Sequence, residues 1–268
     1  MASYNKKVVV SGNIIELYEY EKDVIFGYTD TKKKTKGRQA TANAEDKEKN
    51  REKVLSRARK DLRRIINSNI QKYSKFLTLT FKENITDLDF ANNEFKKFIK
   101  RLNYHYGIKI KYSTVIEFQE RGAIHYHCIL YNLTQKVDVK ELQGIWKQGF
   151  IKINAIDSVD NVGAYVCKYM TKTDDDRLLG RKMYFNSRGL NKPQEIKELE
   201  VVDALVGSLQ QQTLTYENTF SNEHNSVIYK QYNILPKEKK QVINHKELFA
   251  HIKVQGMECS VKASAQSL

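Results

Sequence analysis

One stretch of the chain, residues 76–172, alternates between the two hydrophobic periodicities that distinguish strands from helices, and this succession constrains the fold most strongly. Side chains that alternate between apolar and polar indicate a strand, whereas apolar side chains three and four apart indicate a helix. A turn at residues 119–122 joins two of the strands into a hairpin. In chain order, the predicted segments are a strand at 76–81, a helix at 86–102, strands at 108–118 and 123–130, a helix at 139–146, a strand at 150–153 and a helix at 159–172.

This order, β-α-β-β-α-β-α, predicts an α+β fold. With its strands antiparallel around a central hairpin, the expected sheet is ferredoxin- or RRM-like, the split βαβ arrangement, and is backed by helices on one side. We expect the other face of the sheet to be free for a functional site.

The segments on either side of this region have weaker patterns and are expected to be N- and C-terminal extensions. The chain would then divide into residues 1–72, 73–190 and 191–268. The first extension would contain two short strands between Val8 and Tyr28, a basic loop at 32–38 and a helix at 45–69; the last would contain a helix near 196–209 and strands or loops near 225–234.

The charge balance favours a polyanionic partner. The chain has 46 Lys and Arg residues against 32 Asp and Glu residues, a net charge of +14. Such an excess attracts nucleic acid and releases counterions on contact. A soluble protein that is merely basic would have the same composition, so charge alone leaves both interpretations open.

Several classes of protein are disfavoured. The three cysteines are widely separated and form no C-x-x-C pair, which fits a reducing compartment and argues against a zinc cluster. We expect a cytoplasmic protein that does not bind a membrane, because no apolar run approaches the roughly 18–20 residues of a membrane span and the first residues do not resemble a signal peptide. No G-x-x-x-x-G-K-[ST] loop is present, which disfavours an ATP-driven helicase domain.

The helix at residues 45–69 is expected to bury one apolar stripe and to expose its basic side chains. Such a helix can lie along DNA phosphates, although an ordinary surface helix with basic side chains would look the same. Lys172, at the end of the last predicted helix, is a further candidate for DNA contact. The candidate DNA-binding residues of the basic helix are Arg57, Arg59, Lys60, Arg63 and Arg64.

A candidate metal site lies in the hairpin. His125 and His127 alternate on one strand, so their imidazoles share a face. If the hairpin turns about Arg121, Glu117 lies opposite His125 and projects from the same face. Two imidazoles and a carboxylate suit a divalent ion, Mn²⁺ or Mg²⁺, that also binds a phosphate oxygen and acts as a Lewis acid. The alternative is two surface histidines without a metal.

Two tyrosines in the last predicted helix are candidate nucleophiles. Tyr165 and Tyr169 are four residues apart and therefore share a helix face, and each precedes a lysine by three residues. A phenol is a poor nucleophile at neutral pH, but Lys168 and a nearby metal ion would favour the phenolate. Attack on DNA phosphorus would form a phosphotyrosine and free a 3′-hydroxyl. Two tyrosines packed in a core would show the same spacing.

In these motifs the chain resembles the HUH endonucleases that initiate rolling-circle replication of plasmids, single-stranded DNA phages and integrative elements. Residues 76–81 resemble the first motif of that family, and His125-Tyr126-His127 resembles its metal motif. Residues 165–172 (YVCKYMTK) are similar to the two-tyrosine signature Y-V-x-K-Y-x-x-K of phage-type initiators. The resemblance covers roughly residues 75–172.

The resemblance implies nicking of one strand at a single-stranded or hairpin origin, covalent attachment to the 5′ end, and use of the 3′-hydroxyl as primer. It implies that the two tyrosines alternate as nucleophiles, or that Tyr165 attacks if only one is active, with Tyr169 then a structural neighbour. Glu117 matches the carboxylate ligand of plant-virus initiators. Since many viral members have a helicase domain that this chain lacks, a host helicase and polymerase are the expected partners.

The sequence hypothesis is therefore a replication initiator, a site-specific single-strand DNA endonuclease and strand transferase. Glu117, His125 and His127 would hold the metal, Tyr165 would attack, and Lys168 would stabilise phosphate or phenolate. A mobilisation relaxase or transposase would use the same chemistry. A DNA-binding regulator without enzymatic activity is the alternative from another class.

Overall fold

A computed structural model describes residues 2–26, 44–154, 156, 159–170, 176–178, 181–209 and 213–235 of the chain. The chain forms two compact units, which are considered separately: a central unit, residues 34–192, and a terminal unit, residues 1–33 together with 193–268. Each unit contains a five-stranded sheet in which every neighbouring pair of strands is antiparallel. The predicted α+β class is confirmed.

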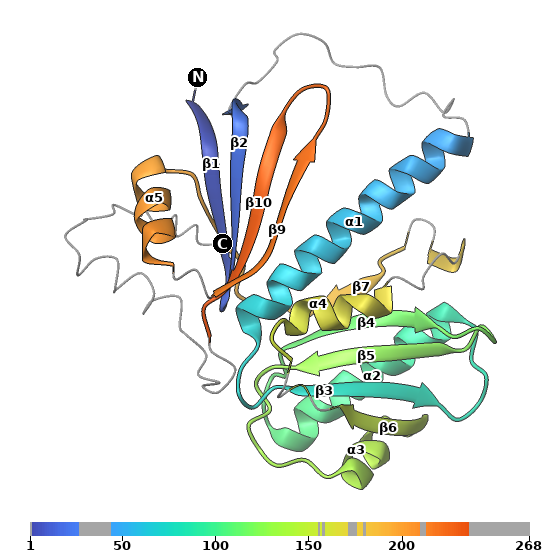
Figure 1. Cartoon of the computed structure of the whole chain (residues 1–268). Coiled ribbons are helices and arrows are strands. Elements are labelled where there is room, and N and C mark those ends of the chain that lie inside the picture. The colour runs from blue at the N-terminus through green and yellow to red at the C-terminus, as the bar shows by residue number, and fades with distance from the viewer. Residues whose placement is uncertain are drawn as a thin grey trace. The chain divides into compact units, whose positions relative to one another are not determined.

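The sheet of the central unit has the strand order β6-β3-β5-β4-β7 (Figure 1). Its first four strands have the order expected for a split βαβ arrangement, with β5 between β3 and β4. β7 adds a short fifth strand at the edge, next to β4. The strands are β3 (Lys75–Phe81), β4 (Tyr112–Phe118), β5 (Ile124–Leu130), β6 (Gly149–Asn154) and β7 (Tyr184–Asn186).

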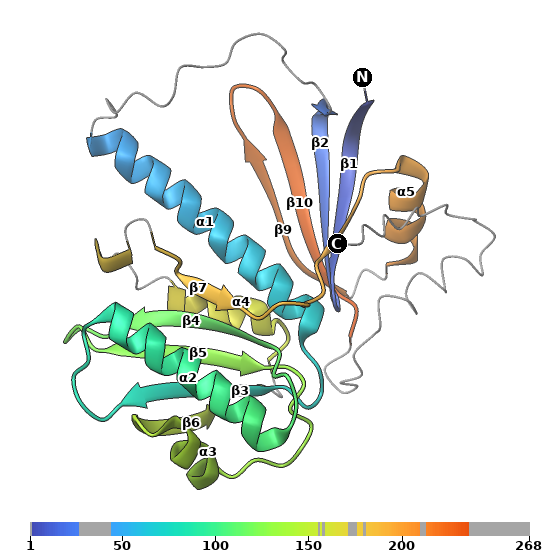
Figure 2. The ribbon, with the colours of Figure 1, turned by 180° about the vertical axis from the view of Figure 1, so that it is seen from behind.

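Helices α2 (Leu88–Tyr106) and α3 (Val139–Trp146) cover one face of this sheet, and α2 crosses it in the rear view of Figure 2. The side chain of Asp87 caps α2 by accepting hydrogen bonds from the next backbone amides, and Gly107 ends the helix in a left-handed conformation. Buried aromatic residues, including Trp146, fill the space between these helices and the sheet. This layer agrees with the prediction.

The expectation that the opposite face of the sheet is free is wrong. Helices α1 (Ala44–Asn69) and α4 (Val162–Cys167) lie on that side (Figure 1). Leu62 and Ile66 of α1 form a second core with Phe76 of β3 and with the apolar residues of α4. The helix at the N-terminal side of the sheet is thus part of the central unit, because its apolar stripe is buried there. The predicted last helix is shorter than expected and continues as the 3₁₀ turn η1 (Lys168–Met170); a further 3₁₀ turn, η2, spans Asp176–Leu178.

The contact between α1 and α4 is unusually close. The side chain of Asn67 accepts a hydrogen bond from the Gly163 backbone amide at 2.8 Å and donates one to Asn161 at 2.9 Å. Asn161 in turn caps α4 by accepting a bond from Ala164. A side chain at Gly163 would overlap the Arg63 carbonyl oxygen, so only glycine allows the two helices to approach this closely.

The sheet of the terminal unit has the order β8-β1-β2-β10-β9 and joins the two ends of the chain. One face packs against α5 through Val8, Val10, Ile15, Val202 and Leu205. The predicted strands near residues 8–28 and the predicted helix near 196–209 are present. The elements are β1 (Ala2–Ser11), β2 (Ile14–Phe26), β8 (Gln194–Ile196), α5 (Leu199–Ser208), β9 (Leu214–Ser221) and β10 (Ser226–Asn233).

The compact units differ from the predicted division into residues 1–72, 73–190 and 191–268. The first extension is split, since its strands pair with the C-terminal strands while α1 packs on the central sheet. Whether the three predicted segments fold independently stays a prediction. None of the helices in the described part of the chain is both long and apolar enough to cross a membrane.

Replacing Gly163 by alanine should lower the free energy of unfolding by about 1–3 kcal/mol, because the new methyl group overlaps the backbone of α1. Gly144 of α3 is the matched control, since a Cβ there meets nothing within 4 Å. Gly144→Ala should stabilise the protein by up to about 1 kcal/mol through helix propensity alone. Urea denaturation followed by circular dichroism measures both changes, and equal effects of the two substitutions would contradict the close contact of α1 with α4.

Candidate active site

Glu117, His125 and His127 lie side by side on the sheet face that α1 and α4 cover. Glu117 is paired with His125 across β4 and β5, which is the register predicted from the turn. The closest contact is diagonal, because His127 Nε2 lies 2.5 Å from Glu117 Oε2. All three side chains are buried, with exposed fractions of 8%, 8% and 3%. The sheet therefore presents two imidazoles and a carboxylate as one group.

The ring of His127 is held from its other nitrogen as well. His127 Nδ1 lies 3.2 Å from the hydroxyl oxygen of Thr78, which also accepts a hydrogen bond from Asn154 at 2.9 Å. A hydroxyl group can donate or accept, so this nitrogen is paired in either tautomer of the imidazole. The chain Asn154–Thr78–His127–Glu117 therefore crosses four neighbouring strands and fixes the orientation of the ring.

His125 differs from His127 in its partners. Within the described residues, its Nε2 atom is buried and has no hydrogen-bond partner. Burial lowers the pKa of the His125 imidazole, the nearby His127 and Arg121 lower it further, and the Glu117 carboxylate opposes them. The ring is therefore expected to be neutral near pH 7, with a nitrogen lone pair available.

No group of three or more His, Cys, Asp or Glu side chains in the described ranges is arranged to hold a metal ion. Glu117 and His127 bond to each other directly instead. Even so, the chemistry of the set suits a divalent ion, and an unpaired buried nitrogen such as His125 Nε2 is the type of atom that a metal would satisfy.

The two tyrosines lie next to the histidines. The ring of Tyr169 stacks on the ring of His127, with centroids 3.6 Å apart and an angle of 19° between the planes. The Tyr169 hydroxyl points at the Tyr165 hydroxyl across 3.5 Å and is the donor of this long hydrogen bond. Phe76, fully buried on β3, contacts both phenol rings. The phenols and the histidines thus share one surface.

The two phenols have different surroundings. Burial raises the pKa of Tyr169 to about 12, and the hydrogen bond to Tyr165 and the charge of Glu117 act in the same direction. In the protein without metal, the phenolate of Tyr169 is therefore disfavoured. The ammonium of the exposed Lys168 lies 5.9 Å from the centre of the Tyr165 ring, close enough for a cation–π contact.

The basic residues of α1 do not form the single exposed set that the sequence predicted. Arg57 and Lys60 are exposed as expected. Arg59 is partly buried and donates to the Met170 carbonyl at 3.4 Å, which ties α1 to the tyrosine segment. Arg64 is buried, with 9% of its surface exposed, because the C-terminal turns of α1 are enclosed on more than one side.

Arg63 is only partly exposed, and its carbonyl lies against Gly163. Lys172 lies outside the described residues. Of the six predicted DNA-contact residues, Arg57 and Lys60 are therefore exposed on α1 as the prediction requires, and contact of any of the six with DNA stays a prediction.

Several residues that shape the site were not identified from the sequence. The alternating pattern of β3 already places Thr78 on the face of the histidines, and strand alternation also pairs it with Asn154 on β6 through the register. Asn161 precedes the helix as a cap residue, a recognisable signal. Asn67 and Phe76 have no such signal, because their roles depend on contacts with distant segments.

Comparison with known proteins supports a replication protein. Residues 74–174 match a family model that describes replication-associated proteins of the ORF2 type. The chain is 28% identical over 109 residues to the "Replication-associated protein ORF4" of Chlamydia phage 1, an alignment that covers 34% of this chain and 27% of that protein. No solved structure matches. Both matches support a replication-associated protein of the kind found in phages, and the family model falls on the central unit.

The imidazole of His125 should titrate below the value of 6.5 that is usual for histidine, because burial disfavours its charged form. The folded state then binds this proton less readily than the unfolded state. The contribution to stability is complete above about pH 6.5 and decreases as the pH falls toward the lower folded pKa. NMR titration of the ring in folded and in urea-unfolded protein without metal measures the difference, and equal midpoints would contradict it.

Proposed function

We propose that this protein is a replication initiator that nicks one DNA strand at an origin and later rejoins the ends in rolling-circle replication. The observation that carries the proposal is the stacking of Tyr169 on His127, which brings a pair of phenols onto a surface with two imidazoles and a carboxylate. This surface lies within the segment that matches replication-associated proteins.

Glu117, His125 and His127 would hold a divalent ion, Mn²⁺ or Mg²⁺. The fit is supported by the unpaired His125 Nε2 and by the direct contact of the other two side chains. When bound, such an ion acts as a Lewis acid that polarises the scissile phosphate. The Thr78–Asn154 pair keeps the His127 ring in position for this role.

Tyr165 is the proposed nucleophile. The Tyr169 hydroxyl donates toward the Tyr165 oxygen, and a donated hydrogen bond stabilises negative charge on the acceptor. The Tyr165 hydroxyl gives up its proton as its oxygen bonds to phosphorus. The bond from phosphorus to the 3′-oxygen then breaks, and this oxygen takes up a proton. The products are a 5′-phosphotyrosine and a free 3′-hydroxyl, without net consumption of a cofactor.

Tyr169 and Lys168 would support this step. Tyr169 is the second nucleophile, used in the rejoining reaction, after a change of hydrogen bonding that exposes its oxygen as acceptor. Lys168, exposed beside the Tyr165 ring, would pair with the phosphate. The reverse reaction, attack of a 3′-hydroxyl on the phosphotyrosine, joins ends because the covalent link conserves the bond energy.

The distribution of charge supports DNA as the partner of the central unit. Residues 34–192 contain 33 Lys and Arg against 18 Asp and Glu residues, whereas the rest of the chain contains 13 against 14. The positive excess therefore belongs to the unit with the candidate active site. Single-stranded or hairpin origin DNA is the proposed substrate, and a host helicase and polymerase would supply unwinding and synthesis.

Incubation of the protein with single-stranded origin DNA and Mn²⁺ should give a covalent adduct that survives denaturation. Tyr165→Phe should reduce adduct formation by about a thousandfold or more, because it removes the attacking oxygen. Tyr104→Phe is the matched control, since Tyr104 is 92% exposed and belongs to α2, and it should leave the yield unchanged.

Tyr169→Phe should retain the first cleavage and reduce rejoining. Chelation of divalent ions, or His125→Ala with His127→Ala, should abolish the adduct while the protein still binds DNA. Absence of an adduct with every divalent ion tested would contradict the nicking proposal and favour a DNA-binding regulator.

A further inference from the structure

A pocket lies within the central unit at the β7 edge of its sheet and has a volume of 540 Å³. Its walls come from α1, α2, the first residue of β4 and the segment that forms β7. The volume falls within the range of about 300–1,000 Å³ that is usual for sites of small ligands. None of the residues that line it belongs to the proposed metal and tyrosine set.

The charge of this pocket has one sign. Lys96, Arg181 and Lys182 line it, and no acidic residue is among the described residues of its walls. Arg181 is oriented by two hydrogen bonds to Asp89, at 2.6 and 3.1 Å, while the side chains of Lys96 and Lys182 are exposed. Such a set of cations attracts an anionic ligand.

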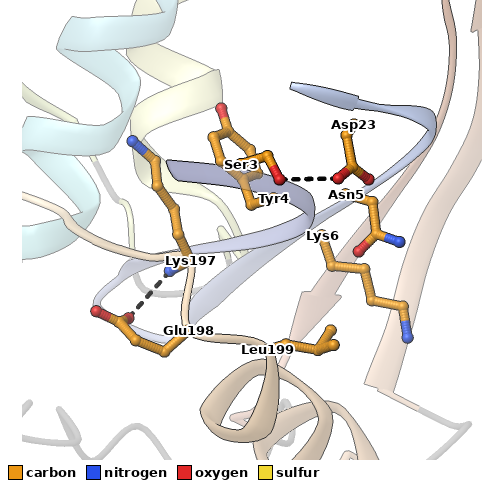
Figure 3. A pocket seen from close by; sticks show the side chains of 8 residues that line it. All are labelled: Ser3, Tyr4, Asn5, Lys6, Asp23, Lys197, Glu198 and Leu199. Atoms are coloured by element: carbon orange, nitrogen blue, oxygen red, sulfur yellow. Dashed lines mark hydrogen bonds between the residues drawn. The ribbon is translucent and has the colours of Figure 1, made fainter. Parts of the chain in front are cut away.

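The pocket of the terminal unit makes the contrast clear (Figure 3). That pocket, of 450 Å³, brings Lys6 and Lys197 together with Asp23 and Glu198. Ser3 and the Lys197 backbone amide already bond to the two carboxylates, as the dashed lines show. Its charges therefore compensate one another, and it has no preference for an anion.

Aromatic side chains complete the pocket at the β7 edge. Tyr112, Tyr184 and Phe185 line it and are partly buried, so their rings are held by the surrounding structure. Phe95 adds a buried ring, packed edge-to-face on Tyr112 at 5.6 Å. Aromatic rings next to cations are the combination with which proteins bind single-stranded nucleic acid, because bases stack on the rings and phosphates pair with the cations.

The pocket is close to the candidate active site. Tyr184 of β7 is paired with Val115 of β4, and Glu117 follows two residues later on the same strand and face. Diagonal neighbours of this kind are about 7–8 Å apart. This separation corresponds to roughly two nucleotides at the rise of about 3.4 Å per nucleotide in a stacked strand.

We propose that this pocket binds an unpaired nucleotide of the DNA strand that flanks the cleavage position. The base would stack against Tyr112, Tyr184 or Phe185, and its phosphate would pair with Lys96, Lys182 and Arg181. This inference rests on the proposed function for the identity of the strand. It assigns to the β7 edge a positioning role, which fixes the phosphate to be cleaved relative to Tyr165.

A fluorescein-labelled oligodeoxythymidine containing one 5-iodouracil is a suitable probe, used with the full chain and without metal so that cleavage does not occur. Lys96→Glu with Lys182→Glu should weaken binding, measured by fluorescence anisotropy, by about tenfold or more. Lys136→Glu with Lys140→Glu is the matched control, since both residues are exposed, lie at α3 and change the net charge equally. This control should weaken binding no more than about threefold.

Photocrosslinking of the unchanged protein provides a measurement that does not depend on folding of a variant, and it should label the peptide with Tyr112 or Tyr184. Equal weakening by both pairs of substitutions, no weakening by either, no binding, or crosslinks elsewhere would each overturn the proposal. Adduct formation with Mn²⁺ judges the proposed function separately: a protein that forms no adduct but binds through this pocket retains the pocket proposal alone.

Discussion

The candidate active site depends on the contact between α1 and α4. Gly163 allows the two helix backbones to approach, and Asn67 connects the amide of Gly163 to the cap residue Asn161. Without this contact, nothing would hold the tyrosine segment against the sheet. A helix of six residues has little stability of its own, so its position must come from tertiary packing. α1, a helix remote in sequence from the motifs, is thus the support on which the tyrosines are placed.

The second constraint is the sheet face itself. Strand alternation and antiparallel register put Glu117, His125, His127 and Thr78 on one face, and the buried Phe76 beneath the phenols fixes the height at which the rings lie. Aromatic stacking of Tyr169 on His127 joins the two halves. A group of polar residues in so buried a place is costly unless it is paired, and most of it is, with His125 Nε2 as the unpaired atom.

The sequence predicted the local features of the central unit well. Periodicity located every strand and helix between residues 75 and 170, and the hairpin turn alone was sufficient to pair Glu117 with His125. The contact partners of distant segments could not be predicted. The stripe of Leu62 and Ile66 shows that α1 buries one side, but not that it buries it against Phe76. Arg59 and Arg64 were predicted to be exposed for the same reason, because a one-sided stripe does not show a second neighbour. The pairing of β2 with β10 likewise joins residues some two hundred positions apart, and short polar and aromatic strands do not specify their partners.

The positive charge, the candidate active site and the match to the family of replication-associated proteins all fall on the central unit. Their common requirement is that two imidazoles, one carboxylate and a phenol reach the same phosphate. Anomalous diffraction from crystals soaked in Mn²⁺ tests this requirement most directly. The predicted result is one strong peak within about 2.0–2.6 Å of His125, His127 and Glu117 side-chain atoms, on the side of the Tyr165 hydroxyl. Peaks only at other positions, or none at saturating Mn²⁺, would contradict it.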